Sequence, residues 1–168
     1  NMHILLTRPL EDSQELMLRL QILGHQISLM PLIKIEKKNH ENINFSDYKG
    51  IIFTSSNSVK FLDIKLIDKK INCFCVGNVT EKKARSVGFQ NTIAAEGNVS
   101  NLKELILQYY DLKDRQLLYV SGEIISVDLD QKLLKEGYRI KRIINYRVSH
   151  NQKFEEKFVK DLKMNIPD

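Results

Sequence analysis

GIIFTSSNSV, residues 50–59, is the stretch of sequence that decides the fold. Its apolar half ends abruptly in a cluster of hydroxyl and amide side chains, and the residues that follow have the spacing of a helix. This order is typical of a buried strand that leads directly into a helix. The stretch therefore predicts a strand-to-helix junction with small polar side chains at the turn.

Three further junctions of the same kind occur along the chain. They are Thr7-Arg8-Pro9, Val76-Gly77-Asn78-Val79-Thr80 and Val120-Ser121-Gly122. In an open parallel sheet every strand-to-helix junction lies at the same edge, so the four turns would gather N–H groups and hydroxyls around one crevice. The sequence thus predicts a site for a polyanionic molecule at that edge.

The connections from helix back to strand also repeat. Gly24, Gly88 and Gly137 each follow a helical pattern and precede an apolar run. A glycine just after a helix adopts the left-handed conformation without a Cβ clash, so it is a common helix terminator. Alternating strands and helices predict a parallel sheet with helices on both faces.

The order of the elements predicts two domains. Residues 36–145 contain a complete set of strands and helices and are interpreted as an inserted α/β domain. Residues 1–35 and 146–168 are interpreted as the first part and the return segment of an outer domain. The extended pieces 32–36 and 144–148 are expected to pair as a two-stranded linker. The predicted fold class is therefore α/β, with two doubly wound parallel-sheet domains, the second inserted in the first, and the outer domain incomplete.

Composition limits the classes of function. The 168 residues are 42% hydrophobic, which is enough for a core, and the net charge of +5 comes from scattered Lys and Arg. No helix carries a continuous basic stripe with interleaved aromatics, so nucleic acid is not an expected partner. A carboxylate-rich or phosphate-rich small molecule suits this charge, although an ordinary protein surface explains most of it.

The cysteines and the hydropathy favour a cytoplasmic protein. Cys73 and Cys75 lie two residues apart in an apolar run, which predicts buried free thiols on one face of a strand. No metal-ligand pattern occurs among the cysteines and histidines. No apolar stretch is long enough to span a bilayer, so no membrane partner is expected.

Several catalytic patterns are absent from the sequence, and the remaining candidates have ordinary structural explanations as well. No nucleotide-binding glycine motif and no Ser-His-Asp pattern can be identified. The hydroxyls of residues 54–58 can bind a ligand or can serve only as helix caps. Tyr146 can donate a proton in a cleft or can be a strand aromatic. Arg8 can bind a carboxylate or can be a surface charge.

The motifs together resemble the uroporphyrinogen-III synthase family. They are Leu5-Leu6-Thr7-Arg8-Pro9, Leu23-Gly24, Pro31-Leu32-Ile33, the stretch 52–59, Val76-Gly77-Asn78-Val79-Thr80, Gly88, Leu133 with Gly137, and Asn145-Tyr146-Arg147. The resemblance covers nearly the whole chain. It implies two domains with an active site in the cleft between them, and a longer outer domain than this sequence contains.

The resemblance also implies a reaction. Members of the family cyclise the linear tetrapyrrole hydroxymethylbilane to uroporphyrinogen III, with loss of water and inversion of the last pyrrole ring, and use no metal or organic cofactor. Carried over, Tyr146 and Thr80 are the catalytic candidates. The substrate-binding candidates are Arg8, Ser55, Ser56, Asn57, Gly77, Ser121 and Gly122. Ser121-Gly122 stands where the family often has Arg-Gly.

The alternative is a non-catalytic α/β module that binds a polycarboxylate or tetrapyrrole ligand. Either protein is expected to be a monomer, with a dimer through the incomplete domain as the other arrangement.

Overall fold

The computed structural model describes residues 1–7, 10–29, 33–150 and 160. The chain divides into two compact units, Asn1–Glu36 with Val148–Asp168, and Lys37–Arg147. We call the second the large unit. The domain boundaries predicted from the sequence, after residues 35 and 145, remain a prediction that an unfolding experiment can test.

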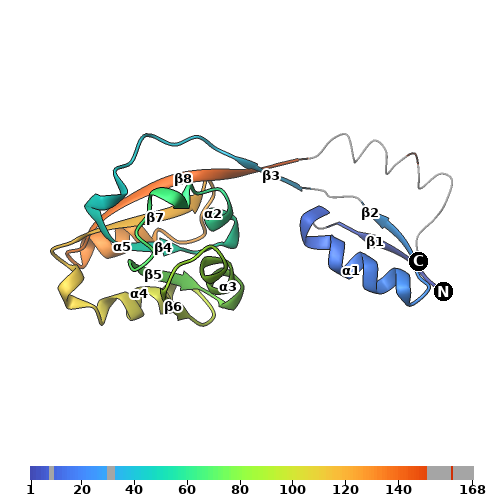
Figure 1. Cartoon of the computed structure of the whole chain (residues 1–168), viewed down its shortest axis with the longest axis horizontal. Coiled ribbons are helices and arrows are strands. Elements are labelled where there is room, and N and C mark those ends of the chain that lie inside the picture. Colours follow the sequence, from blue (N-terminus) through green and yellow to red (C-terminus); the bar gives the residue numbers. More distant parts are fainter. Residues whose placement is uncertain (8–9, 30–32, 151–159, 161–168) are drawn as a thin grey trace. The chain divides into compact units, whose positions relative to one another are not determined.

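The first unit begins with a strand, a helix and a second strand. These are β1 (His3–Leu6), α1 (Leu10–Ile22) and β2 (Gln26–Leu29) (Figure 1). The strands pair in parallel from His3 opposite Gln26 to Leu6 opposite Leu29. Gly24, with φ of 86°, ends the helix, as its place in the sequence predicts. The spacing of Phe154, Phe158 and Leu162 predicts a final amphipathic helix, but these three residues lie outside the described residues.

The large unit is built around a sheet whose strands alternate with helices. The elements are β3 (Ile33–Lys37), β4 (Tyr48–Phe53), α2 (Ser56–Lys60), β5 (Asn72–Val76), α3 (Asn78–Ser86), β6 (Asn91–Ala95), α4 (Val99–Leu107), β7 (Gln116–Gly122), α5 (Leu129–Lys135) and β8 (Arg139–His150). Short 3₁₀ helices occupy Phe45–Asp47, Ile64–Leu66 and Tyr110–Leu112. β3 and β8 both continue past the limits of the large unit.

The strand order is β3-β8-β7-β4-β5-β6, and the pairs from β8 to β6 are parallel (Figure 1). From β4 the chain first adds β5 and β6 on one side, and then β7 and β8 on the other. The order of strands therefore reverses between β4 and β7, which makes their carboxyl ends the topological switch point of the sheet. The predicted α/β class with parallel strands is confirmed.

Each face of the sheet carries its own apolar core. On one face α2 and α3 cover a cluster that includes Ile51, Phe53 and Val120. On the other face α4 and α5 cover a cluster that includes Ile52 and Tyr119. Neighbouring residues of one strand thus serve opposite cores, because successive side chains of a strand point to opposite faces. This arrangement is the doubly wound sheet that the alternating elements predict.

Two local features refine the sequence analysis. The sequence pattern after the first junction predicts a helix over 57–66. In the structure α2 ends at Lys60, and Asp63 then caps a separate 3₁₀ helix by accepting a hydrogen bond from the Lys65 N–H. Cys73 and Cys75 are free and fully buried, with their sulfurs 3.8 Å apart, as predicted. The contact with Cys75 and burial both raise the pKa of the Cys73 thiol.

Within the described ranges no helix has the length and apolar character needed to cross a bilayer.

Candidate functional site

A cavity of about 190 Å³ lies at the carboxyl ends of β4 and β7. Its walls come from the turn after β4, the segment after β7, the start of α4 and the strand β8. The lining residues are Thr54, Ser55, Val99, Tyr119, Gly122, Ile124, Ile125, Ser126, Val127 and Tyr146. Ligands of doubly wound proteins bind at this topological position. We call this cavity the switch-point cavity.

The switch-point cavity is lined by neutral hydroxyl groups and by apolar side chains. Five of the lining side chains carry a hydroxyl, and none of the ten is charged. Hydroxyls can donate to carboxylate oxygens without bringing a full charge into the cavity. A larger cavity of about 410 Å³ lies at the amino ends of β4 and β5, and none of its lining residues is a predicted site residue. We therefore place the candidate site in the switch-point cavity.

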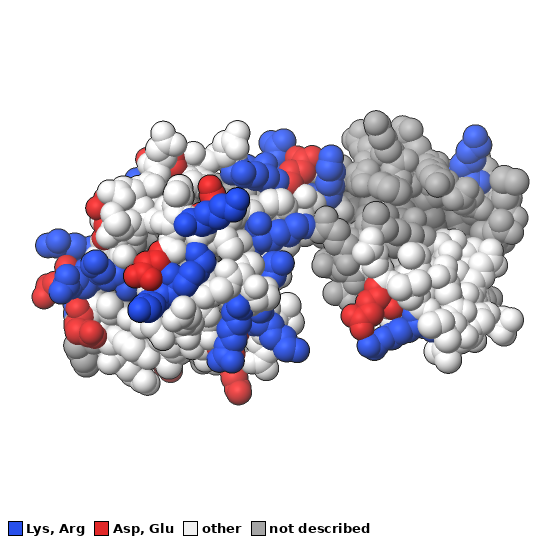
Figure 2. All heavy atoms as spheres, in the orientation of Figure 1, with Lys and Arg blue, Asp and Glu red and all other residues white. Residues whose placement is uncertain are grey.

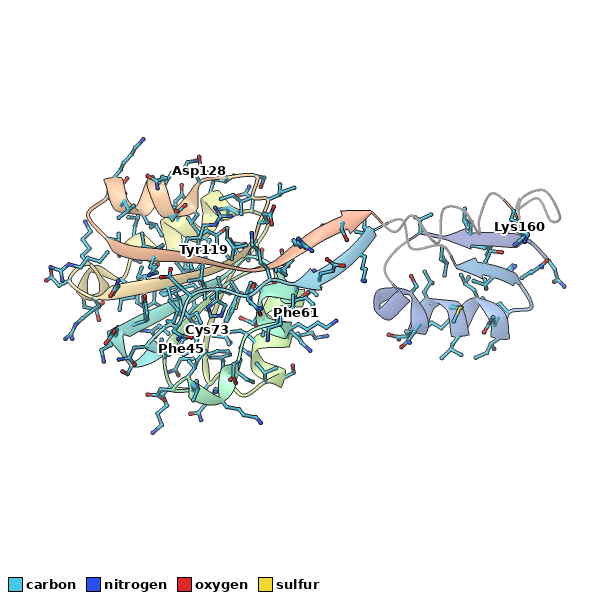
Figure 3. All side chains as sticks on the ribbon, turned by 90° about the horizontal axis from the view of Figure 1, so that it is seen from above. Phe45, Phe61, Cys73, Tyr119, Asp128 and Lys160 are labelled. Atoms are coloured by element: carbon cyan, nitrogen blue, oxygen red, sulfur yellow. The ribbon has the colours of Figure 1, made fainter. Side chains whose placement is uncertain are left out.

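Tyr146 lies directly on Gly122. The β7–β8 register shifts at this point, so that Ser121 is opposite Ile144 but Gly122 is opposite Tyr146. A Cβ on Gly122 would lie 2.6 Å from Cζ of Tyr146 and 2.8 Å from its hydroxyl oxygen. The half-buried ring of Tyr146 also lies near Phe61, labelled in Figure 3, with ring centroids 6.4 Å apart. The ring thus contacts both the end of β7 and the residue that follows α2.

Arg142 fixes the irregular end of β7 beneath this tyrosine. Its Nε donates to the Ser121 hydroxyl at 2.7 Å, and its Nη2 donates to the carbonyls of Gly122 at 2.9 Å and Glu123 at 3.2 Å. The Glu123 N–H in turn donates to the Tyr146 carbonyl at 3.0 Å. The guanidinium therefore satisfies two backbone carbonyls at the end of β7, where the register shifts.

The turn after β4 brings a second set of hydroxyls to the cavity. Thr54 lies 3.4 Å, oxygen to oxygen, from the hydroxyl of Tyr119, a buried residue of β7 labelled in Figure 3. Burial raises the pKa of Tyr119, so its hydroxyl stays protonated well into the alkaline range. Ser55 caps α2 by accepting a hydrogen bond from the Asn57 N–H at 3.1 Å. Ser56 and Asn57 are half-buried but do not line the cavity.

The junction after β5 holds Gly77 and Thr80. Gly77 has φ of 79°, and open space lies where its Cβ would be, so its backbone is accessible to a ligand. Its N–H already donates to the Ala95 carbonyl at 2.9 Å. Thr80, on α3, is 5% exposed. Neither residue lines the switch-point cavity.

Three of the predicted site residues, Ser55, Gly122 and Tyr146, thus share one cavity. Ser121 is fully buried, and its hydroxyl donates to the Gly122 carbonyl as well as accepting from Arg142. Arg8 lies outside the described residues. Among the described residues no group of three or more His, Cys, Asp and Glu side chains could hold a metal ion.

Sequence reasoning missed several wall residues. Tyr119 lies inside an apolar run and reads as core, and the segment 124–127 follows the predicted junction without any motif. The apolar pair Ile124-Ile125 in a polar segment was the one available signal, because large apolar side chains in loops often serve a binding surface. Phe61 and Arg142 carry no such signal, since only the folded chain brings them to the site.

Basic side chains are spread over the large unit. Figure 2 shows Lys and Arg interspersed with Asp and Glu on its visible face, without a single continuous basic patch.

Comparison with known proteins identifies relatives. The family model for uroporphyrinogen-III synthase HemD matches residues 14–166. None of the curated protein sequences matches the chain.

Solved structures with the same fold are also found. A uroporphyrinogen-III synthetase from Helicobacter pylori superposes with a TM-score of 0.55 and 18% identity, over 74% of this chain and 57% of that one. A mutant uroporphyrinogen III synthase from Thermus thermophilus superposes with a TM-score of 0.61 and 14% identity, over 98% of this chain and 69% of that one. The chain thus spans 57% of the length of the first protein and 69% of the length of the second.

Proposed function

Because this chain belongs to the uroporphyrinogen-III synthase family, we propose that it takes part in the cyclisation of hydroxymethylbilane to uroporphyrinogen III. The reaction removes water from the hydroxymethyl end of the linear tetrapyrrole, inverts the last pyrrole ring and closes the macrocycle. The observation that carries the proposal is the switch-point cavity, where Ser55, Gly122 and Tyr146 come together.

The substrate suits this cavity chemically. Its acetate and propionate groups need hydrogen-bond donors, and its pyrrole rings need apolar surface. Five hydroxyl side chains and the apolar side chains of Val99, Ile124, Ile125 and Val127 supply both. Thr80 is proposed as a second catalytic residue, and Arg8 and Gly77 as substrate-binding residues, outside the cavity. Ser56, Asn57 and Ser121 are proposed to support the turns from which the contacts come.

Tyr146 is proposed to assist the departure of the hydroxyl group. Its phenol donates a proton as the carbon–oxygen bond breaks, so that water leaves. At ring closure a pyrrole carbon forms the new bond, and it then loses a proton when the ring regains aromaticity. This proton replaces the one that the phenol gave up. Since uncatalysed closure gives the type I isomer, holding the chain in the geometry that favours inversion contributes more than proton transfer.

A direct assay tests this function. Freshly generated hydroxymethylbilane is supplied to the protein, and the uroporphyrin isomers are separated after oxidation. We expect type III product from the unaltered chain. For Tyr146→Phe we expect the rate to fall by at least about 10²-fold, which is the range for loss of a general acid. Tyr48→Phe is the matched control, because Tyr48 lies at the amino end of β4, whereas the cavity lies at its carboxyl end.

Two results would contradict the proposal. Type I product alone from the unaltered chain would indicate a protein without this activity, and calorimetry with a tetrapyrrole carboxylate would then show whether it only binds. Equal rates for Tyr146→Phe and the unaltered chain would remove Tyr146 from the reaction.

A further inference from the structure

We propose that Asn145 is a positioning residue, whose buried amide holds the turn containing Ser55 at a set distance from Tyr146 and so determines which isomer is formed. This inference rests on the proposed function for its catalytic consequence. The structural part rests on contacts within the large unit alone.

Asn145 lies immediately before Tyr146 on β8, and its side chain is fully buried. Its Nδ2 donates to the carbonyl of Ser58, on α2, at 2.8 Å. Its own carbonyl accepts from the Lys38 N–H at 2.9 Å. One residue therefore connects β8, the segment after β3 and the helix that follows β4.

The connection continues from Ser58 to the wall of the cavity. The Ser58 hydroxyl, also fully buried, donates to the Ser55 carbonyl at 2.6 Å. The Ser55 hydroxyl accepts from the Asn57 N–H at 3.1 Å. These hydrogen bonds in series run from the neighbour of Tyr146 to Ser55, and both Ser55 and Tyr146 line the switch-point cavity.

The other half of the Asn145 amide has no partner. Among the described residues its Oδ1 is the one buried side-chain nitrogen or oxygen without a hydrogen bond. A buried carbonyl left unpaired costs about as much stability as the bond made by Nδ2 contributes. Asn145 is thus poorly explained as a stabilising residue, whereas fixing the geometry of Ser55 against Tyr146 uses the bond that it does make.

The effect on the reaction follows from distance. If the turn after β4 shifts relative to β8, the substrate groups held at Ser55 move relative to the hydroxyl that Tyr146 protonates. A displacement of about 1 Å is enough to lower a rate by about 10²-fold when catalysis depends on positioning. Substrate that is held loosely also closes directly, which yields the type I isomer.

The test compares Asn145→Ala with Tyr138→Phe. Tyr138 is 2% exposed, and its hydroxyl donates to the Ile106 carbonyl at 2.9 Å on the other face of the sheet, so the control removes a similar buried bond far from the turn. We expect Asn145→Ala to lower kcat at least tenfold with a smaller change in KM, and to raise the type I fraction. We expect amide hydrogen exchange at Asn57 to become at least tenfold faster in this variant, and to stay unchanged in Tyr138→Phe.

Ser58→Ala provides an independent variant. It breaks the link to Ser55 but keeps Asn145 and Tyr146, so the same changes should appear in the same direction. This variant decides the question if Asn145→Ala does not fold. Unchanged exchange at Asn57 and an unchanged isomer ratio in a folded variant would overturn the proposal.

The two proposals fail in different ways. If the unaltered chain forms no type III product, the proposed function fails, while hydrogen exchange still measures whether Asn145 holds the turn. If type III product forms but neither variant changes exchange or isomer ratio, only the role of Asn145 is refuted.

Discussion

Gly122 shows how a single residue type can shape the candidate site. Its backbone φ is not in the left-handed region, so conformational freedom does not explain the glycine. The reason is space, because a Cβ at this position would overlap the ring of Tyr146. The hydrogen atom of glycine lets the ring lie against the end of β7 and line the cavity.

The first prediction concerns this contact. Gly122→Ala should lower the free energy of unfolding by about 1–3 kcal/mol, the usual cost of overpacking, because the Tyr146 ring must move. In a Tyr146→Ala background the same change should cost less than about 0.5 kcal/mol. Urea denaturation of the four proteins measures this coupling.

Gly50→Ala is the control for that cycle. A Cβ there would lie 2.6 Å from Cδ2 of Leu117, so it is also overpacked but does not touch Tyr146. Its cost should be the same in both backgrounds. Additive costs for Gly122→Ala and Tyr146→Ala would show that the ring does not depend on the glycine.

At the residue scale the sequence predicted which residue types lie near the site better than it predicted which side chains face the cavity. The predicted clusters at 54–58, 76–80 and 120–122 do lie at the ends of β4, β5 and β7, and Ser55, Gly122 and Tyr146 line one cavity. Ser121, however, directs its hydroxyl to Arg142 and Gly122. Which of two neighbours faces the cavity depends on the register shift between β7 and β8, and that shift has no signature in the sequence.

At the scale of elements, caps and terminators agree with the structure. Ser55 caps α2, and Gly88 and Gly137 follow helices in the positive-φ conformation. The exception is α2, which is shorter than its apolar pattern predicts. Asp63 competes with the helix there by capping the next turn, so local hydrogen bonding overrides periodicity.

The second prediction separates the two roles of Ser55. Ser55→Ala should lower the free energy of unfolding by about 1 kcal/mol, because the Asn57 N–H loses its acceptor. Ser55→Asp should keep that acceptor and the stability, but it should weaken binding of a carboxylate-rich ligand by like-charge repulsion. Thermal unfolding and calorimetry with a tetrapyrrole carboxylate measure the two effects.

Asn44→Asp is the matched control. Asn44 caps the 3₁₀ helix before β4, at the other edge of the sheet, and its substitution adds the same charge while keeping an acceptor. It should leave ligand affinity unchanged. Equal affinity for Ser55→Asp and Asn44→Asp would show that the ligand does not approach Ser55.

At the scale of the whole molecule, both apolar cores belong to the large unit. Every buried residue of the two clusters lies between Tyr48 and Ile143. The described part of the first unit contributes a two-stranded pair and one helix, on which Leu18 and Ile22 are exposed. The large unit therefore has two apolar cores of its own to stabilise it.

The third prediction is that residues 33–150 fold without the rest of the chain. This fragment keeps all six strands of the larger sheet and both cores. It should unfold in one cooperative transition with a free energy of at least about 5 kcal/mol, as expected of a domain of this size. Urea denaturation followed by circular dichroism and tyrosine fluorescence tests this, and a broad non-cooperative transition would contradict it.

The sequence by itself determined the alternation of strands and helices, the parallel α/β class, the junctions where a site can form and the family resemblance. These features depend on local periodicity, capping and turn residues, which each short segment encodes. Only the tertiary structure decided that the turns after β4 and β7 enclose a cavity with Tyr146, that Tyr119 lines it, and that Asn145 joins β8 to α2. Those outcomes depend on strand order, register and contacts between residues up to 87 positions apart, which no local pattern contains.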